Sequence, residues 1–412
     1  MCNKRLLLVL LLAAAPARAQ TVDATATSLI SGRQDPRDGS VHTIVPFYEN
    51  LAILATDLKN PLVQDTRIVL SAWGALTAAE QPAGNDASGD VDLAFVEGTL
   101  DRRRMQLRAG RQLIFGGAAR ALPLDGVDVR SRLFDGVSVD VYGGVPATPK
   151  FAVNQGDGAA GGRVFWRPSP SIETGASFVH VLGEGRIDRQ EAGVDARFSP
   201  RSSFSVTALA LWSTVETRLA EAQLLTIWQP VRKVEISLDA ARQSPDLLIP
   251  RGSIFSVFAE ETRDELGGGL YLRPLVPLRI YLDGHAIADE SGVGARAGGR
   301  ATLSFFGTTF GAETRAVELP SKGFVELRGF ASRRFYERAF VTLDSESVWL
   351  DPAVNGQTNS LTVSGSLGCD VGSGWMLVGN ALGGQTPLLE RRFEVMAKLV
   401  YNGTLRLREV QK

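Results

Sequence analysis

Hydrophobic and polar residues alternate one by one along most of the chain, in blocks of about ten residues. In the block 233–240, every odd position is polar or charged and every even position is apolar. The same alternation recurs at 189–198, 278–286, 360–367 and 393–401. Successive side chains of a β-strand point to opposite faces, so each block predicts a strand with one apolar face and one charged or hydroxylated face.

The connections between the blocks are of two kinds. Short turns are predicted at 199–201, 229–231, 273–277 and 370–374. Longer, polar and glycine-rich connections are predicted at 32–45, 78–89, 145–160, 243–261 and 350–359. Short turns at one end and long loops at the other are typical of a meander that crosses a membrane. The sequence therefore predicts an all-β fold, a transmembrane up-and-down antiparallel β-barrel.

The blocks number about 22, and two of them, 125–131 and 308–317, alternate only weakly. Barrels of single bacterial chains usually have even strand counts, so we expect an even number between 16 and 22. Two water-soluble folds compete with the barrel. A β-propeller would show a repeat of about 40 residues, which is lacking. A β-sandwich of this length would need two domains, and no linker or change in composition divides the chain.

The N-terminal segment predicts export. Lys4 and Arg5 precede an apolar run at 6–15, and small residues at 17 and 19 match a signal-peptidase site. The run is about half the length of a membrane-spanning helix. We therefore expect a cleaved signal peptide at 1–19, a barrel at 20–412, and localisation in the outer membrane of a Gram-negative bacterium, in contact with its lipid.

Composition narrows the function classes. The 44 Lys and Arg nearly balance 45 Asp and Glu, and loss of Lys4, Arg5 and Arg18 with the signal takes the net charge from −1 to −4. This balance argues against a nucleic-acid partner. Removal of Cys2 leaves Cys369 alone, which excludes an intrachain disulfide and a multi-cysteine zinc site.

Catalytic chemistry finds little support. The chain has three histidines, and none has a convincing nucleophile beside it. The stretch 156–161 matches a dinucleotide fingerprint by letter, but it opens onto a strand-like alternation and not onto a helix. We expect no enzymatic activity, no cofactor and no metal.

The charged faces of the strands provide the candidate functional residues. In a barrel these faces would line the lumen, where arginines and carboxylates set solute preference through the field that they focus. The predicted pore-lining residues are Arg104, Arg108, Asp140, Arg163, Arg167, Glu191, Asp195, Arg197, Glu235, Asp239, Arg279, Asp283, Arg300, Glu326, Arg328 and Glu394.

Tryptophan positions bear on the membrane prediction. The six tryptophans fall near the ends of alternating blocks, at 73, 166, 212, 228, 349 and 375. Aromatic residues at the ends of membrane-spanning strands form girdles at the two lipid–water interfaces.

One stretch resembles a known family. Gly110-Arg111-Gln112 ends one strand, Gly116-Gly117 and Arg120 follow, and Phe134-Asp135-Gly136-Val137 opens another strand. This pattern resembles outer-membrane porin-like barrels, and locally the alginate-export, or polysaccharide-export, family. The resemblance implies an aqueous channel for sugars or similar solutes. It also suggests that the connection 116–124 folds into the lumen, as comparable loops do in porins. Arg111 falls on the lipid-facing side of its strand, unless a bulge at Gly110 turns it inward.

Two hypotheses follow for function. The first is a channel for hydrophilic solutes, with a slight lean to (poly)saccharide translocation and a possible periplasmic export-system partner. The second is a plugged barrel that acts as a scaffold or anchor in a secretion or motility machine, because densely packed opposite charges could close the lumen.

The facing assignment predicts unequal effects of substitutions on stability. Ile236→Arg or Leu282→Arg should cost about 2–4 kcal/mol if these positions face lipid near the midplane. Lys233→Ala and Asp283→Ala should cost much less, because their side chains face water. The free energy of unfolding from lipid vesicles measures the difference. Equal losses for the arginine and alanine variants would contradict the assignment.

Overall fold

The structure is a computed structural model that describes residues 21–37, 40–58, 63–77, 87–100, 104–147, 157–248, 262–336 and 338–406. The expected signal peptide at 1–19 lies outside these residues and stays a prediction. Within the described ranges nearly every residue belongs to a strand, as the alternating pattern predicts. No helix in these ranges is long and apolar enough to cross a bilayer.

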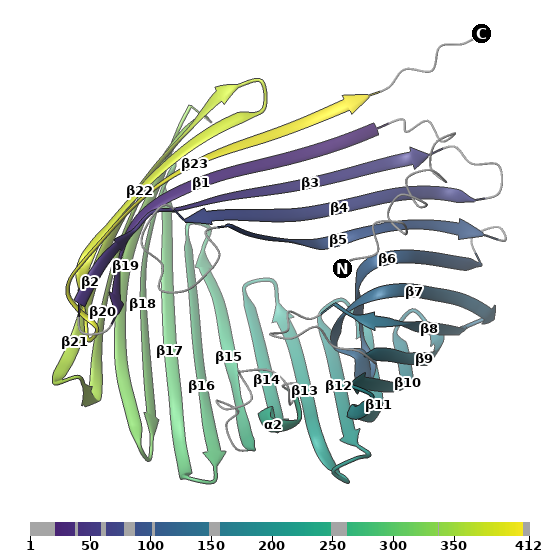
Figure 1. Ribbon diagram of the computed structural model, residues 1–412. Helices are drawn as coiled ribbons and strands as arrows, with labels where there is room; N and C mark the ends of the chain where they lie inside the picture. The colour runs from purple at the N-terminus through teal and green to yellow at the C-terminus, as the bar shows by residue number, and fades with distance from the viewer. Residues whose placement is uncertain are drawn as a thin grey trace.

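The strands follow one another around a single wall (Figure 1). Their bounds are β1 (Thr21–Arg37), β2 (Ser40–Ile44), β3 (Pro46–Leu58), β4 (Gln64–Thr77), β5 (Ala87–Leu100), β6 (Met105–Phe115), β7 (Ala121–Phe134), β8 (Val137–Pro146), β9 (Gly158–Ser169), β10 (Ile172–Gly183), β11 (Arg186–Arg201), β12 (Phe204–Ser213), β13 (Arg218–Val231), β14 (Val234–Gln243), β15 (Arg263–Leu275), β16 (Leu278–Asp289), β17 (Gly292–Phe305), β18 (Thr308–Leu319), β19 (Lys322–Phe335), β20 (Ala339–Val354), β21 (Gln357–Gly372), β22 (Trp375–Thr386) and β23 (Leu389–Arg406). Two short helices are also present, η1 (Gly117–Ala119) and α2 (Pro245–Leu248).

The wall closes on itself through its first and last strands. β1 pairs antiparallel with β23 along 21–33 (Figure 1) and with β3 along 21–30. β2 and β3 continue one another, because both pair with β1 in a single register, Arg33 opposite Ile44 and Ile30 opposite Phe47. The 23 strand segments of the described residues therefore make 22 strands around the barrel. Both the predicted up-and-down barrel and the even strand count are confirmed, and the weak blocks at 125–131 and 308–317 lie in β7 and β18.

Connections differ between the two ends of the barrel. β1 begins and β23 ends at one end, here called the turn end, where most connections are two-residue turns such as 135–136 and 306–307. The opposite end, here called the loop end, carries the longer connections at 78–86, 147–157 and 244–262. Two predicted loops are wrong. Residues 32–37 and 40–44 instead belong to β1 and β2, and residues 350–354 and 357–359 belong to β20 and β21, which are joined by a two-residue turn at 355–356.

Exposure identifies the two faces of the wall. Adjacent residues show the contrast: Glu265 has a side-chain exposure of 17% and its neighbour Leu266 is 65% exposed. Glu326 and Leu327 show the same contrast, with exposed fractions of 17% and 52%. The convex outer face spreads its side chains apart and the concave inner face crowds them together. A water-soluble protein would expose the acids and bury the leucines. The charged face is therefore the inner one, and the apolar face is built for lipid.

Aromatic residues mark the edges of the apolar face. Trp166, Trp228 and Trp375 lie near the turn end, and the Trp375 ring packs against Tyr401 with centroids 4.7 Å apart. Trp212 and Trp349 lie near the loop end. All five are exposed by 40–53%. Rings at these two levels match the interfacial girdles of membrane barrels.

Trp73 is the exception among the tryptophans. It lies opposite Asn50 in the β3–β4 register, and Asn50 lies opposite Thr27 of β1. These positions share a face with Lys398 and Glu394 of β23, so Trp73 lies on the charged face.

Tryptophan fluorescence tests this assignment. Brominated lipid should quench the tryptophan fluorescence of a variant that lacks only Trp73, because its remaining tryptophans lie on the apolar face. A variant that keeps only Trp73 should be quenched little. Equal quenching of the two variants by the same vesicles would show that the faces are assigned wrongly.

Candidate functional site

The sixteen predicted pore-lining residues all lie in the described part of the chain, and those that lie on strands share the charged face. Fifteen lie on strands, and Arg104 lies in the turn just before β6. The register places many of them opposite a complementary group. Asp140 lies opposite Arg163, Arg300 opposite Glu313, and Glu394 opposite Arg33. Alternation within each strand and pairing between strands thus bring residues far apart in sequence onto one surface.

A first ionic network follows β4 to β8. Glu97 of β5 accepts from Arg67 at 2.8 Å and from Arg108 at 2.6 Å, so one carboxylate joins three strands. On the next strands Arg130 contacts Asp140 at 2.6 Å. The Glu97 carboxylate is only 8% exposed, which explains why it needs two cationic partners.

The network continues on β9 to β11. Arg163 contacts Glu173 at 2.8 Å and also pairs with Asp195. Glu173 in turn pairs with Arg167, a second predicted residue. Gly175 lies between Arg163 and Asp195, and a Cβ at this position would lie 2.7 Å from the Arg163 Nε atom. A side chain there would separate the ion pair.

A second network lies on β14 to β20. The His285 Nε2 atom is 2.9 Å from Asp239, two strands away, and reaches it over Gly267. Arg296 contacts Glu265 at 2.7 Å. Arg328 bonds to Asp344 at 2.6 Å, and Glu326 and Asp283 make looser contacts of 4.0 Å to Arg315 and 3.8 Å to His285. Glu394 has a similar loose contact, 3.6 Å to Arg392.

The remaining predicted residues are not held by ion pairs. Within the described ranges, no carboxylate lies within 4 Å of Arg104, Arg197, Arg279 or Arg300, and no cation within 4 Å of Glu235. Arg300 instead lies over the Phe330 ring, 5.1 Å from its centroid. These groups keep their charges available to water or to a solute.

The connection between β6 and β7 folds over the charged face. Residues 116–120 pack against β9 to β12 through η1, where the Ala118 amide donates to the Ser177 Oγ atom at 2.9 Å. Ala118 and Ala119 are buried with Leu124, Val179 and other apolar residues in a small core. The suggestion that this connection folds inward agrees with the structure.

Arg120 anchors the far end of this connection. Its guanidinium bonds to Glu191 of β11 at 2.6 Å and to Glu221 of β13. The Glu191 side chain is 1% exposed, so Arg120 neutralises a fully buried carboxylate. Arg120 belongs to the family-like stretch of the sequence and is not among the predicted pore-lining residues.

Arg111 proves to face outward. No register shift separates β6 from β7 at this position, and Arg111 lies opposite Asp125 on the apolar-face parity. It contacts Asp125 at 2.7 Å and Asp90 at 2.8 Å. Gly110 takes a left-handed φ of 123° but does not turn Arg111 inward.

Several charged-face residues are not among the predicted ones. Glu97, Asp344 and Glu313 each pair with a predicted arginine. Their alternation within β5, β20 and β18 is visible in sequence. The signal that would identify them is the strand register, which sequence alone does not provide.

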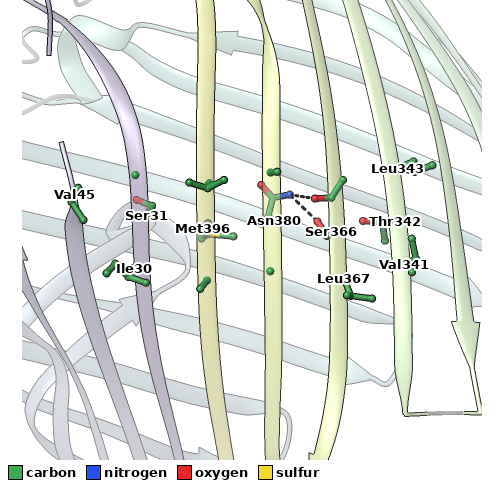
Figure 2. Close-up of a pocket in the computed structure, with 16 residues that line it drawn as sticks. Ile30, Ser31, Val45, Val341, Thr342, Leu343, Ser366, Leu367, Asn380 and Met396 are labelled. Carbon is green, nitrogen blue, oxygen red and sulfur yellow. Dashed lines mark hydrogen bonds between the residues drawn. The ribbon is translucent and has the colours of Figure 1, made fainter. Parts of the chain in front are cut away.

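A shallow hollow of about 700 Å³ lies on the apolar face, across β20 to β23 and β1 (Figure 2). Small residues form its floor, among them Gly365, Gly379 and Ala397. On the same strands Asn380 donates to Ser366 at 2.8 Å (Figure 2), both at charged-face positions. The hollow belongs to the lipid-facing wall and is separate from the ionic networks. No group of His, Cys, Asp and Glu in the described ranges could hold a metal ion.

No protein-family model and no curated protein sequence matches this chain. Many solved structures are similar to it, among them an usher pore and an outer membrane protein. The translocation pore of the P pilus usher PapC is 9% identical and has a TM-score of 0.52, covering 94% of this chain and 100% of its own. The outer membrane protein opdK from Pseudomonas aeruginosa is 10% identical and has a TM-score of 0.50, covering 93% and 98%.

These likenesses show the fold. The chain has the fold of outer-membrane β-barrels, and a closed 22-stranded barrel with an apolar exterior is an architecture of the Gram-negative outer membrane. The expected localisation is confirmed.

Removal of Arg120 should destabilise the barrel strongly. Arg120→Ala leaves the buried Glu191 without its partner, which should cost about 3–5 kcal/mol. Arg315→Ala is the matched control, because Arg315 is 51% exposed and its contacts to Glu313 and Glu326 are 3.6 and 4.0 Å. The control should cost about 0–1 kcal/mol. Urea unfolding from lipid vesicles measures both, and equal losses would mean that Arg120 does not anchor the connection.

Proposed function

We propose that the barrel is a channel that lets hydrophilic solutes cross the outer membrane, with the charged face lining a water-filled lumen. A water-filled interior supplies the solvent that charged groups need. It also agrees with Arg104, Arg197, Arg279 and Arg300, which have no carboxylate within 4 Å among the described residues. The sixteen predicted residues are then the groups that a passing solute meets.

The ion pairs run along the wall and not across the lumen, and this observation favours an open channel. Every ion pair between described strand residues lies within one strand, between adjacent strands, or between strands two apart. Arg163–Asp195 and His285–Asp239 are examples of the last kind. No such ion pair joins opposite sides of the barrel. Salt bridges of this kind stiffen the wall and leave the space in front of it unobstructed.

The connection at 116–120 is the narrowing element of this proposal. It covers part of the charged face from β9 to β12 and is held there by Arg120. A constriction beside fixed charges selects solutes by size and by charge, because the field of those charges is least screened where the pore is narrowest.

Saccharides are the solute class that we favour. Planar guanidinium groups beside carboxylates can make several hydrogen bonds at once to sugar hydroxyl and uronate groups. The local resemblance to alginate-export barrels supports the same lean. A periplasmic export-system partner and a cleaved signal peptide at 1–19 complete this proposal.

A plugged scaffold is the second candidate. The small apolar core around Ala118 and Leu124 shows that part of the charged face is already filled by protein. A barrel closed in this way would hold partners in an envelope machine and pass no solute. It predicts no single-channel conductance and recovery of envelope proteins with the barrel from outer membranes.

Planar-bilayer recording decides between these candidates. The purified barrel should show stable single-channel currents, and closure at every voltage and salt concentration would contradict the channel. Sugar passage is read from swelling of proteoliposomes in neutral and uronate oligosaccharides. Swelling that is equal for sugars and for unrelated solutes of the same size would contradict the saccharide preference.

The charged face should also set ion preference. Glu326→Gln with Glu394→Gln removes two acids from the proposed lumen and should shift the reversal potential in a salt gradient toward anion preference. Glu49→Gln is the matched control, because Glu49 lies on the apolar face, where it accepts a hydrogen bond from Ser28. An equal shift in both proteins would contradict the lumen assignment.

A further inference from the structure

Among the residues that the structure describes, the pairing along the seam between β5 and β6 stops before the two strands end. Their ladder ends at the Ala94–Arg111 pair. Beyond it, 87–93 of β5 pair with β4 and 112–115 of β6 pair with β7, but the two segments do not pair with each other. The ladder has seven paired positions, against eleven between β6 and β7. The turn-end half of the seam is closed and the loop-end half is not.

Gly110 is the position from which β6 leaves β5. Its φ of 123° is a conformation that side chains rarely allow. A Cβ there would also lie 2.1 Å from the Ala94 carbonyl oxygen. From this point β6 turns away from β5 (Figure 1). Gln112 and Ile114 are buried, and Ile114 belongs to the apolar core that includes Ala118 and Ala119 of the inward connection. The contacts of Arg120 with β11 and β13 hold the departing strands inside the barrel.

Arg111 spans the open part of the seam. Its Nε atom donates to Asp125 of β7 at 2.7 Å, and its Nη1 atom donates to Asp90 at 2.8 Å and to the Val91 carbonyl oxygen at 2.8 Å. One side chain therefore connects both edges where backbone pairing has stopped.

The opening begins within the membrane. Leu100 ends β5 at the turn end, and the last paired residue, Ala94, is six positions away. At about 3.3 Å per residue and a strand tilt of about 45°, this distance is roughly 14 Å of height, inside an apolar band of about 25 Å. Unpaired backbone groups facing lipid cost several kcal/mol each, so a closed barrel has reason to pair them. The incomplete pairing here needs an explanation.

We propose that the β5–β6 seam is a lateral portal through which an amphipathic molecule passes between the barrel interior and the bilayer, with Arg111 as its latch. The polar groups at the edges of the seam can form hydrogen bonds with the head of such a molecule in place of water. The apolar chain of the molecule then faces lipid. Asp90 and Asp125 share the single Arg111, so the seam carries an excess of negative charge and favours a cationic head over an anionic one. Release of the contacts of Arg111 with Asp90 and Val91 opens the seam. The contact with Asp125 then holds the Arg111 side chain beside β7.

Photolabelling tests the portal directly. The probes are a single-chain alkyl amine with a diazirine on its chain and the fatty acid of equal length, each added to the full barrel in lipid vesicles. The amine should label residues of 90–93 and 113–115 well above the rest of the apolar face, and the acid should label them less. Arg111→Ala should raise this labelling severalfold.

A crosslink supplies the closing control. In a Cys369→Ser background, Asp90→Cys with Arg111→Cys joined by a short bismaleimide should reduce seam labelling severalfold. Ala109→Cys with Val127→Cys, an outward pair on the complete β6–β7 ladder, should leave it unchanged when joined in the same way. Uniform labelling of the apolar face, or labelling that the seam crosslink does not reduce, overturns the portal.

Conductance separates this inference from the proposed channel. The seam crosslink should leave ionic conductance at the wild-type level, because the aqueous path runs along the barrel axis. Loss of conductance on crosslinking would mean that the seam is part of the aqueous path, and would overturn the portal as a separate route. A barrel that never conducts but shows crosslink-sensitive labelling would contradict the channel and leave the portal standing.

Discussion

Every strand of a wall in lipid must satisfy the hydrogen-bonding groups of its backbone on both edges, because the hydrocarbon offers no substitute for water. The pairing of β1 with both β23 and β3 meets this requirement by closing the sheet. Closure makes one face convex and the other concave. This curvature decides which side chains are exposed outside and which are crowded inside. Leu266 and Leu327 can then be exposed without penalty, and Glu265 and Glu326 can be crowded together inside.

The crowded inner face stabilises its charges by pairing them along the wall. Glu97 takes two arginines and Glu191 takes Arg120, since a buried carboxylate without a cation would be costly. Glycines such as Gly175 and Gly267 make room for pairs that reach across a strand. The same face carries other arginines, such as Arg197 and Arg279, that have no ion pair among the described residues. In the proposed channel, the paired residues would stabilise the wall and the unpaired ones would meet the solute, all on one charged face.

The sequence was sufficient for those parts of the structure that depend on local alternation. The barrel, its even strand count and the common face of the fifteen predicted residues that lie on strands all follow from a period of two and from closure. Strand ends were less predictable: 350–359 has the composition of a loop, but β20 and β21 extend into it and pair again at Val354 and Gln357, after a register shift, just before a two-residue turn. Contacts set by register were not predictable. The partners of Arg120 lie 71 and 101 residues away, and no local pattern indicates them. The β5–β6 seam depends on one φ angle at Gly110, and a glycine in a strand has several possible meanings.

The central claim is that neighbouring positions on one strand face lipid and water in turn. Spin labels at Val363→Cys and Ser364→Cys, each in a Cys369→Ser background, measure it at the middle of β21, where Val363 is 49% exposed on the apolar face. In lipid vesicles, the label at 363 should collide mainly with dissolved oxygen and the label at 364 mainly with a water-soluble nickel complex. The same accessibility at both positions, or the reverse order, would contradict this account of the barrel.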